Sequence, residues 1–267
     1  MRALEKTFSD LKTKGRKAFI AYITAGDPDI ESTVRLVREL EANGVDIIEL
    51  GIPFSDPIAD GPVNQEAAQR ALQKDINLGI ILNAVKMIRT ESQIPIVFFS
   101  YLNPILVYGM ERFAKDAKAC GLSGVLVLDM PPEEAGDYKV LMENNDLDTI
   151  FLVSPITPVE RIELIVKFAS GFVYYVSQMG VTGVRNDVSK TIPLMVGEIK
   201  KLTNIPVAVG FGISTPNQVS DIAGHADGVI VGSSIVKKIG EKGNNPGFEK
   251  EIGEYVKTLT APLKGVQ

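Results

Sequence analysis

Short apolar runs alternate with longer, mixed polar and apolar stretches along the whole chain. Several of the short runs, such as GVLVL at 124–128 and GVIVG at 228–232, are apolar at consecutive positions. That pattern is typical of strands buried on both faces, as in a parallel sheet covered by helices. It predicts eight strands, at residues 19–24, 45–51, 94–101, 124–128, 149–153, 172–176, 206–209 and 228–231.

Between these strands, apolar residues recur at the three- and four-residue spacing of amphipathic helices. Proline next to a capping residue marks several helix starts, as in Asp27-Pro28, Thr157-Pro158 and Thr215-Pro216. The segments with the clearest helical pattern are 30–42, 80–89, 110–119, 133–143 and 159–168.

Eight strands separated by helices predict an α/β fold, a (β/α)8 or TIM barrel, with residues 4–13 as an extra N-terminal helix. An open doubly wound sheet is the alternative, but the TAGDPD that follows the first strand lacks the GxGxxG spacing of that fold. No linker divides the chain. We therefore expect a single barrel domain over residues 1–267.

Composition narrows the classes of function. The chain has 267 residues, 45% of them hydrophobic, and a formal charge of −5 without a basic run. We therefore expect neither nucleic acid nor a membrane surface as a partner. No apolar run is long enough to span a bilayer and no signal peptide is visible, so the expected location is cytoplasmic.

Thiol and metal chemistry have few side chains to work with. Cys120 is the only cysteine, and we expect it to be a small buried residue. His225 is the only histidine, which excludes a histidine-rich metal site, and it precedes the last strand at the rim opposite the expected site.

Two strand-to-helix connections are longer than the usual 2–6 residues. They are GIPFSDPIADGP at 51–62, after the second strand, and SQMGVTGVRNDV at 177–188, after the sixth. Loops at the carboxyl ends of barrel strands carry binding and catalysis. Surface insertion is the alternative interpretation, but the residues in and beside these loops favour a functional site.

Two acidic residues lie in or next to the first of these loops. Glu49 falls inside IIELGI, an otherwise apolar strand. A carboxyl there must be ion-paired, close to water or partly neutral, and the last case gives a raised pKa that suits general acid/base chemistry. Asp60 lies within the loop between Ala59 and Gly61, where a helix cap is the structural alternative.

Glycine-bearing turns follow the last three strands and indicate a phosphate site. Gly183, Gly212 and Gly232 let backbone N–H groups approach an anion, and Ser233 opens a helical stretch. Neither the GFG nor the VGSS turn contains Lys or Arg, so oriented peptide dipoles would hold the phosphate. Apolar and aromatic residues near the strand ends could line an adjoining pocket: Tyr22, Phe99, Leu126, Tyr174, Phe211 and Ile230.

The loop string ELGIPFSDPIADGPVNQ closely resembles that of the tryptophan synthase α-subunit family. AYITAGDPD, VSQMGVTGVR, VAVGFGIS and VGSSIV are similar to the same family and occur in the same order. The resemblance implies a lyase that cleaves indole-3-glycerol phosphate to indole and glyceraldehyde 3-phosphate in a retro-aldol step, and we expect it to use neither a metal nor an organic cofactor. It also implies a role in tryptophan biosynthesis.

The resemblance assigns roles to individual residues. Glu49 matches the general acid/base, and Asp60 matches the acid that pairs with the indole N–H. The phosphate-binding backbone is matched by Gly183, Gly212, Gly232 and Ser233. The substrate pocket is matched by Tyr22, Phe99, Leu126, Tyr174, Thr182, Phe211 and Ile230. Two residues depart from the pattern: Gln178 stands where Arg is common, and Tyr22 replaces a common Phe.

The resemblance also implies a partner, a β subunit that receives the indole in an α2β2 complex. The matching rim contains Pro53, Asp56, Pro57, Ile58, Asn103, Pro104, Met130, Pro131 and Pro132. An exposed apolar surface there would suit docking, although a solvated loop tip is the alternative. We expect the 51–62 loop to act as a lid that orders on docking.

Three other functions stay open on sequence grounds. A phosphosugar isomerase could use the same barrel, but SYLNPI and LDMPPE after the third and fourth strands do not fit it. A non-catalytic activator could bind indole-3-glycerol phosphate, which the presence of both acids disfavours. A free-standing indole-producing lyase would share every catalytic residue with the leading hypothesis.

Overall fold

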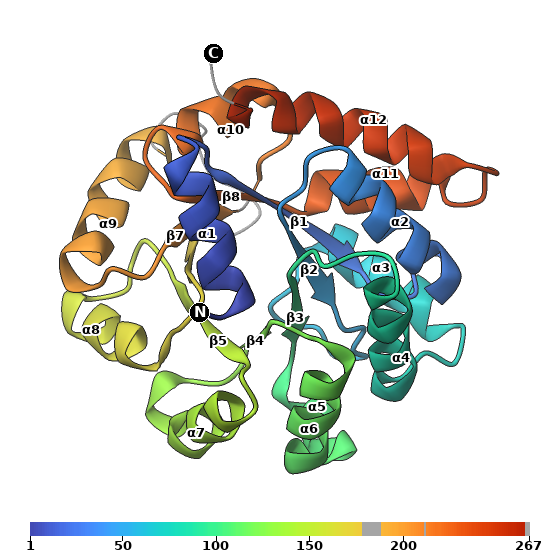
Figure 1. Ribbon diagram of the computed structural model, residues 1–267, viewed down its shortest axis with the longest axis horizontal. Helices are drawn as coiled ribbons and strands as arrows, with labels where there is room; N and C mark the ends of the chain where they lie inside the picture. Colours follow the sequence, from blue (N-terminus) through green and yellow to red (C-terminus); the bar gives the residue numbers. More distant parts are fainter. Residues whose placement is uncertain (178–187, 211, 265–267) are drawn as a thin grey trace.

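The computed structural model describes residues 1–177, 188–210 and 212–264. Eight parallel strands form a closed barrel in sequence order, as Figure 1 shows. Each strand pairs with the next, and β8 pairs with β1 to complete the ring. The strands are β1 (Ala18–Thr24), β2 (Ile47–Gly51), β3 (Ile96–Ser100), β4 (Gly124–Val127), β5 (Asp148–Val153), β6 (Val173–Val176), β7 (Val207–Gly210) and β8 (Gly228–Val231). The predicted barrel is confirmed, and the open sheet is excluded.

Helices surround this ring and bury its outer face. Their bounds are α1 (Ala3–Thr13), α2 (Ile30–Ala42), α3 (Pro62–Leu72), α4 (Leu78–Arg89), α5 (Leu102–Tyr108), α6 (Met110–Cys120), α7 (Gly136–Asn144), α8 (Val159–Phe168), α9 (Val188–Leu202), α10 (Pro216–Ala223), α11 (Ser233–Lys242) and α12 (Phe248–Thr260), with short 3-10 turns η1 (Pro132–Glu134) and η2 (Ala261–Leu263). The bounds predicted for α2 and α8 are confirmed. The segment predicted as one helix at 133–143 divides into η1 and α7, and α5 and α12 were missed.

The strand residues pack into two separate apolar layers. Side chains such as Phe19, Ile48 and Phe98 point outward and join the layer beneath the helices. Their neighbours Ile20, Ile47 and others point inward and fill the barrel. Burial on both faces explains why these strands read as continuous apolar runs.

Helix α1 closes the N-terminal end of the barrel, where it crosses the ring in Figure 1. Its buried Leu4, Phe8 and Leu11 join the inner apolar layer. The guanidinium of Arg2 donates to Asp148 at 2.9 Å, at the start of β5. The extra N-terminal helix is therefore confirmed, and it plugs the end of the barrel opposite the long 51–62 loop.

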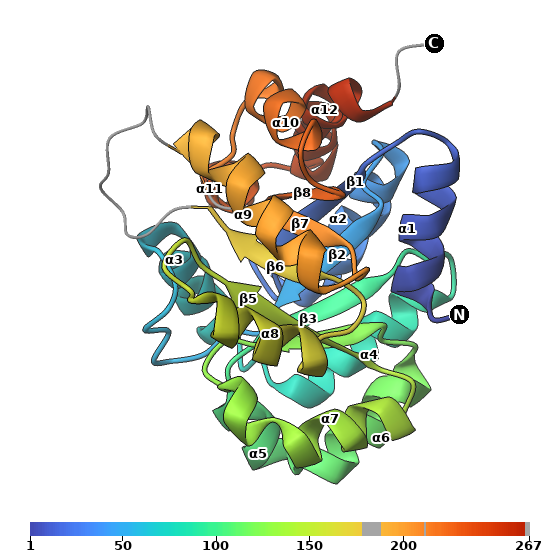
Figure 2. The ribbon, with the colours of Figure 1, turned by 90° about the vertical axis from the view of Figure 1, so that its left-hand side faces the viewer.

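Helix α3 and the loop before it lie at the other end of the barrel, as the side view in Figure 2 shows. Arg70 of α3 makes two hydrogen bonds to the buried carboxylate of Asp27, at 2.8 and 2.7 Å. Asp27 follows β1. This bidentate pair fixes the helix that follows Asp60 to the carboxyl end of the first strand.

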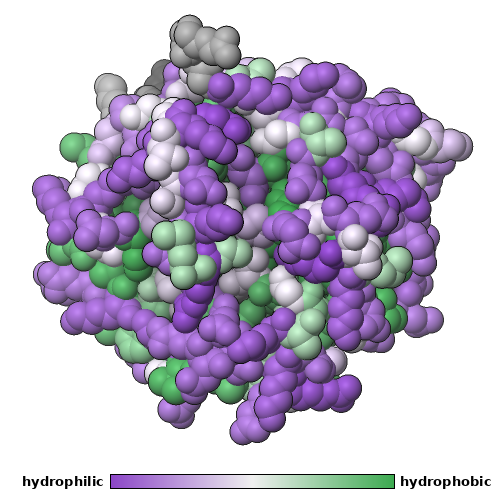
Figure 3. Space-filling view, viewed as in Figure 1, coloured by the Kyte–Doolittle hydropathy of each residue, from purple (hydrophilic) through white to green (hydrophobic). Residues whose placement is uncertain are grey.

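The single cysteine and the single histidine differ in their exposure to solvent. Cys120 is buried as expected, and His225 is exposed at the start of β8. Figure 3 shows that the face on the side of α1 is largely hydrophilic, with scattered hydrophobic groups. Within the described residues, no helix is long and apolar enough to cross a membrane.

The contact between α1 and the barrel generates a stability prediction. Gly171 has φ of +72°, and a Cβ on it would lie 2.7 Å from Leu4 Cδ1. Gly171→Ala therefore adds a steric clash to the cost of a left-handed backbone, and we expect a loss of about 2–4 kcal/mol in urea denaturation. Gly15→Ala is the matched control, because Gly15 has φ of +66° and nothing within 4 Å of the added Cβ. Equal losses for the two variants would contradict the proposed packing of α1.

Candidate active site

Glu49 is a fully buried carboxyl in the mouth of the barrel. It lies on β2 opposite Tyr22 of β1 and Val97 of β3, two residues that face inward. Its exposed fraction is 0%, and neither carboxyl oxygen has a hydrogen-bond partner within the described part of the chain. Burial raises the pKa of Glu49 from 4.5 to about 8 because the charged form loses its solvation. Among the described residues Glu49 has no ion-pair partner, and its raised pKa agrees with the partly neutral carboxyl that was one of the three alternatives.

Asp60 is held at the same end of the barrel by Tyr101. The Tyr101 hydroxyl donates to Asp60 Oδ2 at 2.9 Å and accepts the N–H of Ala59 at 2.9 Å. The Tyr101 ring also packs on Phe54, with 5.2 Å between centroids. These contacts tie both parts of the 51–62 loop to the residue that follows β3. The sequence pattern predicts Tyr101 only as the end of a strand and gives no sign of this role.

The pKa of Asp60 reflects two opposing effects. Burial raises the pKa, and hydrogen bonds from Tyr101 and Asn64 lower it, with a net shift upward from the ordinary value. The carboxyl is therefore partly desolvated, but it has donors that favour its charged form. Glu49 has none among the described residues. Two carboxyls at one mouth thus have environments of different kinds, as in many acid/base sites.

Tyr22 connects these two acids to the rest of the mouth. Its phenol lies over Gly51, where an added Cβ would overlap the hydroxyl oxygen. Its ring meets Phe99 edge-on, with 5.1 Å between centroids. The pKa of Tyr22 is raised mainly by burial, and the negative charges of Asp60 and Glu49 raise it further. The structure therefore brings Tyr22, Phe99 and both acids to one end of the barrel.

Tyr174 of β6 has the same relation to Gly210 of β7, where a Cβ would lie 2.5 Å from the Tyr174 hydroxyl. The pKa of Tyr174 is raised by burial and then by Glu49 and Tyr22, so its phenol faces the same space. Leu126 and Ile230 belong to the inner layer with Tyr174. Five predicted pocket residues therefore point into the barrel. Thr182 and Phe211 lie outside the described residues.

The last of the predicted phosphate turns, at Gly232, lies beside Tyr22. A Cβ on Gly232 would be 3.2 Å from Tyr22 Cβ, and Gly232 immediately precedes α11. The exposed Ser233 is the first residue of that helix. The first N–H groups of a helix lack intrahelical acceptors and attract anions. This turn is therefore suited to an anion next to the pocket.

A hydrogen bond joins the last two glycine turns. Ser234 Oγ donates to the carbonyl of Ile213 at 3.2 Å, which ties the start of α11 to the loop after β7. Gly212 lies in that loop, with φ of +73° that favours glycine. Gly183 and Gln178 lie outside the described residues. Three of the four predicted phosphate-binding residues are therefore placed on one rim.

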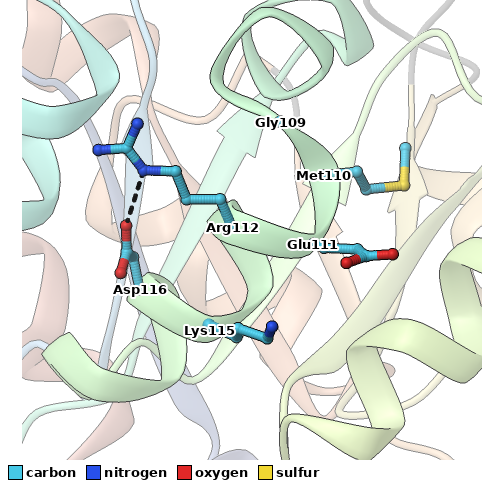
Figure 4. Close-up of a pocket in the computed structure, with 6 residues that line it drawn as sticks. All are labelled: Gly109, Met110, Glu111, Arg112, Lys115 and Asp116. Carbon is cyan, nitrogen blue, oxygen red and sulfur yellow. Dashed lines mark ion pairs between the residues drawn. The ribbon is translucent and has the colours of Figure 1, made fainter.

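Two pockets lie away from the barrel mouth, and neither is lined by Glu49, Asp60 or the glycine turns. One, of about 610 Å³, lies at the start of α6 and is drawn in Figure 4. There Arg112 and Asp116 turn toward each other, 3.5 Å apart, and Asp116 also accepts the Tyr108 hydroxyl at 2.7 Å. The other, of about 1190 Å³, lies beneath α1 and contains the Arg2–Asp148 pair. We therefore place the candidate site at the opposite end, with Glu49. The described residues contain no cluster of three or more His, Cys, Asp or Glu suited to a metal ion.

Comparison with known proteins is consistent across sequence and structure. Residues 8–261 match the family described as tryptophan synthase alpha chain. The chain belongs to the tryptophan synthase alpha chain family. Relatives of that name include those of Geobacter sulfurreducens, 47% identical over 99% of this chain and 98% of the relative, and Geotalea daltonii, 45% identical over 99% and 98%.

Solved structures of the family have the same barrel. The structure of Mycobacterium tuberculosis tryptophan synthase superposes with a TM-score of 0.89 at 36% identity, covering 98% of both chains. Tryptophan synthase subunit alpha from Legionella pneumophila gives 0.89 and 36%, covering 100% of both. Members of the alpha chain family are lyases that cleave indole-3-glycerol phosphate in tryptophan biosynthesis. The predicted enzyme class and biosynthetic role are confirmed, and the isomerase hypothesis is set aside.

The rim residues that the family resemblance singled out differ in exposure. Asp56, Ile58 and Asn103 are exposed, whereas Pro57, Pro104 and Pro131 are half-buried. Pro53, Met130 and Pro132 are buried, so the expectation of an exposed apolar surface is wrong for these three. Met130 joins the apolar layer beneath the helices, and sequence spacing does not reveal which rim residues are covered in this way. Exposed Leu106 and Val107 of α5 lie after β3 and were missed.

The buried Glu49 makes stability depend on pH. Between pH 4.5 and 8 the folded state keeps a proton on Glu49 that the unfolded state releases, so rising pH destabilises the fold through this window. Glu49→Gln removes that effect, and we expect a gain of about 3 kcal/mol at pH 7 that vanishes near pH 4. Urea denaturation of both proteins at several pH values measures it. A gain that does not change with pH would contradict a raised pKa.

Proposed function

We propose that Glu49 and Asp60 carry out the retro-aldol cleavage of indole-3-glycerol phosphate in this chain. The observation that supports this most strongly is the carboxyl of Glu49. It is fully buried without a partner in the described residues, and it has a pKa of about 8 in the mouth that also holds Asp60. A group with a pKa near neutrality can both give and accept a proton.

The proposed reaction uses Glu49 twice. Protonated Glu49 gives its proton to C3 of the indole ring, which becomes an indolenine cation. The bond between C3 and the hydroxyl-bearing carbon then breaks, and its electron pair neutralises the ring. The hydroxyl becomes the aldehyde of glyceraldehyde 3-phosphate as its proton passes to Glu49, which restores the starting state. Atoms and charges balance without a cofactor.

Asp60 has a different part in this mechanism. Its carboxylate, held by the Tyr101 hydroxyl, faces the indole N–H and stabilises the positive charge that develops on the ring. The turns at Gly212, Gly232 and Ser233, together with Gly183, hold the phosphate. Tyr22, Phe99, Leu126, Tyr174 and Ile230, together with Thr182 and Phe211, enclose the ring. Anchoring the phosphate would orient C3 toward Glu49.

Turnover of substituted proteins tests these roles. We expect Glu49→Gln to lower kcat for indole release by about 10²–10⁴-fold, because proton transfer is lost while the shape is kept. Asp60→Asn should lower it by about 10²–10³-fold through loss of charge stabilisation. Both variants should still bind 3-(indol-3-yl)propyl phosphate, which cannot be cleaved. Glu66→Gln, an exposed carboxyl on α3, is the control. Full activity of Glu49→Gln would rule out the mechanism.

We further infer that the rim beside the site docks a β subunit in an α2β2 complex. The support is an apolar group at the carboxyl ends of β2 and β3, where Ile58 is 88% and Val107 80% exposed and Leu106 is adjacent. Exposed apolar groups gathered at one rim are typical of interaction sites. In this structure Tyr101 already holds Asp60, so docking would stabilise a placement of the loop that exists without the partner.

A charge placed on this rim tests the interface. We expect Val107→Glu to weaken binding to the β subunit at least tenfold, because a desolvated carboxylate would face the partner. Met87→Glu, at an exposed apolar residue of α4, is the matched control and should bind normally. Isothermal titration calorimetry with purified subunits gives both affinities. Wild-type affinity of Val107→Glu would exclude Val107 from the interface, and absence of any binding by the wild type would favour a free-standing lyase.

A further inference from the structure

Asn64 is a polar residue near Asp60, and the sequence pattern alone indicates no role for it. It lies in the first turn of α3, four positions after Asp60. Side chains on a helix lean toward its N-terminus, so residue 64 extends back over residue 60. The Asn64 side chain lies close enough to the Asp60 carboxyl to lower its pKa, as a hydrogen-bond donor does.

The chemistry of the two groups fixes the orientation of the amide. A carboxylate only accepts hydrogen bonds, so the NH2 group of Asn64 is the part of the amide that can bond to Asp60, and its carbonyl oxygen is left without a bond to that carboxylate. That oxygen, Oδ1, is buried and has no donor among the residues that the structure describes. A buried acceptor without a donor costs about 1–3 kcal/mol. The cost is recovered if a bound molecule supplies the donor.

The other side chains that contact Asp60, those of Tyr101 and Gln65, have no buried polar atom without a partner among the described residues. The Tyr101 hydroxyl accepts from Ala59 and donates to Asp60. Gln65 donates its side-chain amide to the Asp60 carbonyl at 2.8 Å. Both contacts hold the loop, and neither side chain appears among the buried polar atoms without a partner in the described residues. Asn64 is the neighbour that both holds the carboxylate and leaves a buried acceptor next to it.

We propose that Asn64 is a specificity-determining residue whose Oδ1 shares the indole N–H of the substrate with Asp60. The inference deepens the proposed function and rests on it, since Asp60 is assigned there to the same N–H. As the ring becomes an indolenine cation its N–H becomes a stronger donor, so this hydrogen bond strengthens in the transition state. The NH2 group meanwhile keeps the Asp60 carboxylate in place.

Two ligands that differ only in the ring N–H test this directly. They are 3-(indol-3-yl)propyl phosphate and 3-(1-benzothiophen-3-yl)propyl phosphate, in which sulfur replaces N–H. We expect the wild type to prefer the indole ligand at least tenfold in calorimetric titrations, because the benzothiophene leaves Oδ1 without a donor. Asn64→Leu should lose about tenfold in affinity for the indole ligand and little or nothing for the benzothiophene.

Two controls separate accepting a hydrogen bond from holding the loop. Gln69→Leu removes an exposed amide on the same helix and should keep the wild-type preference. Tyr101→Phe removes a donor to Asp60 without touching Oδ1, so it should lower kcat but keep much of the preference for the indole ligand. Asn64→Ala should behave as Asn64→Leu does, which excludes an effect of the leucine side chain itself.

A pH profile supplies an independent readout. Loss of the Asn64 donor raises the pKa of Asp60, so the acidic limb of kcat/KM should move to higher pH in Asn64→Leu. A merely structural role would lower activity at every pH and leave both the limb and the ligand preference unchanged. Wild-type preference between the two ligands in Asn64→Leu would overturn the proposal.

Failure of the proposed function gives a different result. It would appear as retained turnover in Glu49→Gln or Asp60→Asn. The binding comparison needs no turnover, so it reports on Asn64 whatever the outcome of those two variants. A donor supplied to Oδ1 by another part of the chain would leave Asn64→Leu with the wild-type preference, and it would count against the proposal in the same way.

Discussion

The arrangement at the barrel mouth depends on one desolvated carboxyl. Glu49 is enclosed by strands whose other side chains are mostly apolar, and no described group hydrogen-bonds to it. Keeping it there costs folding free energy as soon as it ionises, which is why its pKa lies near 8. Natural proteins accept local instability of this kind at functional sites, where a proton must be held and released near neutral pH.

Paired tyrosine and glycine residues shape the space around that carboxyl. Tyr22 fills the position that a side chain on Gly51 would take, and Tyr174 does the same at Gly210. In each case a large ring on one strand requires glycine at the carboxyl end of the next strand. This packing builds the walls of the pocket from the ring of strands itself, while α1 closes the other end with Leu4, Phe8 and Leu11. Stability and chemistry thus occupy opposite ends of the barrel.

The local pattern of apolar and polar residues predicted most of the fold and part of the site. Runs that are apolar on consecutive residues identified all eight strands, because parallel strands are buried on both faces. The inward direction of Tyr22, Phe99, Leu126, Tyr174 and Ile230 follows from their places on those strands. The short α5 and the terminal α12 were missed, since the clearest periodic segments lay elsewhere. The unusual acid at 49 was visible because its neighbours are apolar.

The hydrogen bonds and the burial of the site residues depend on contacts between residues that are distant in the sequence. The bond from Tyr101 to Asp60 spans 41 residues, and only closure of the barrel brings the ends of β2 and β3 together. The lack of a donor to Asn64 Oδ1 among the described residues depends likewise on which neighbours surround that atom. The burial of Pro53, Met130 and Pro132 and the exposure of Val107 have the same origin. The sequence by itself determined the order of strands, the acidic residues and the glycine turns, because these follow from local periodicity and residue type. Only the tertiary structure decided which groups share the mouth and which hydrogen bonds they lack, because solvation and pairing belong to the packed surroundings and not to the residue alone.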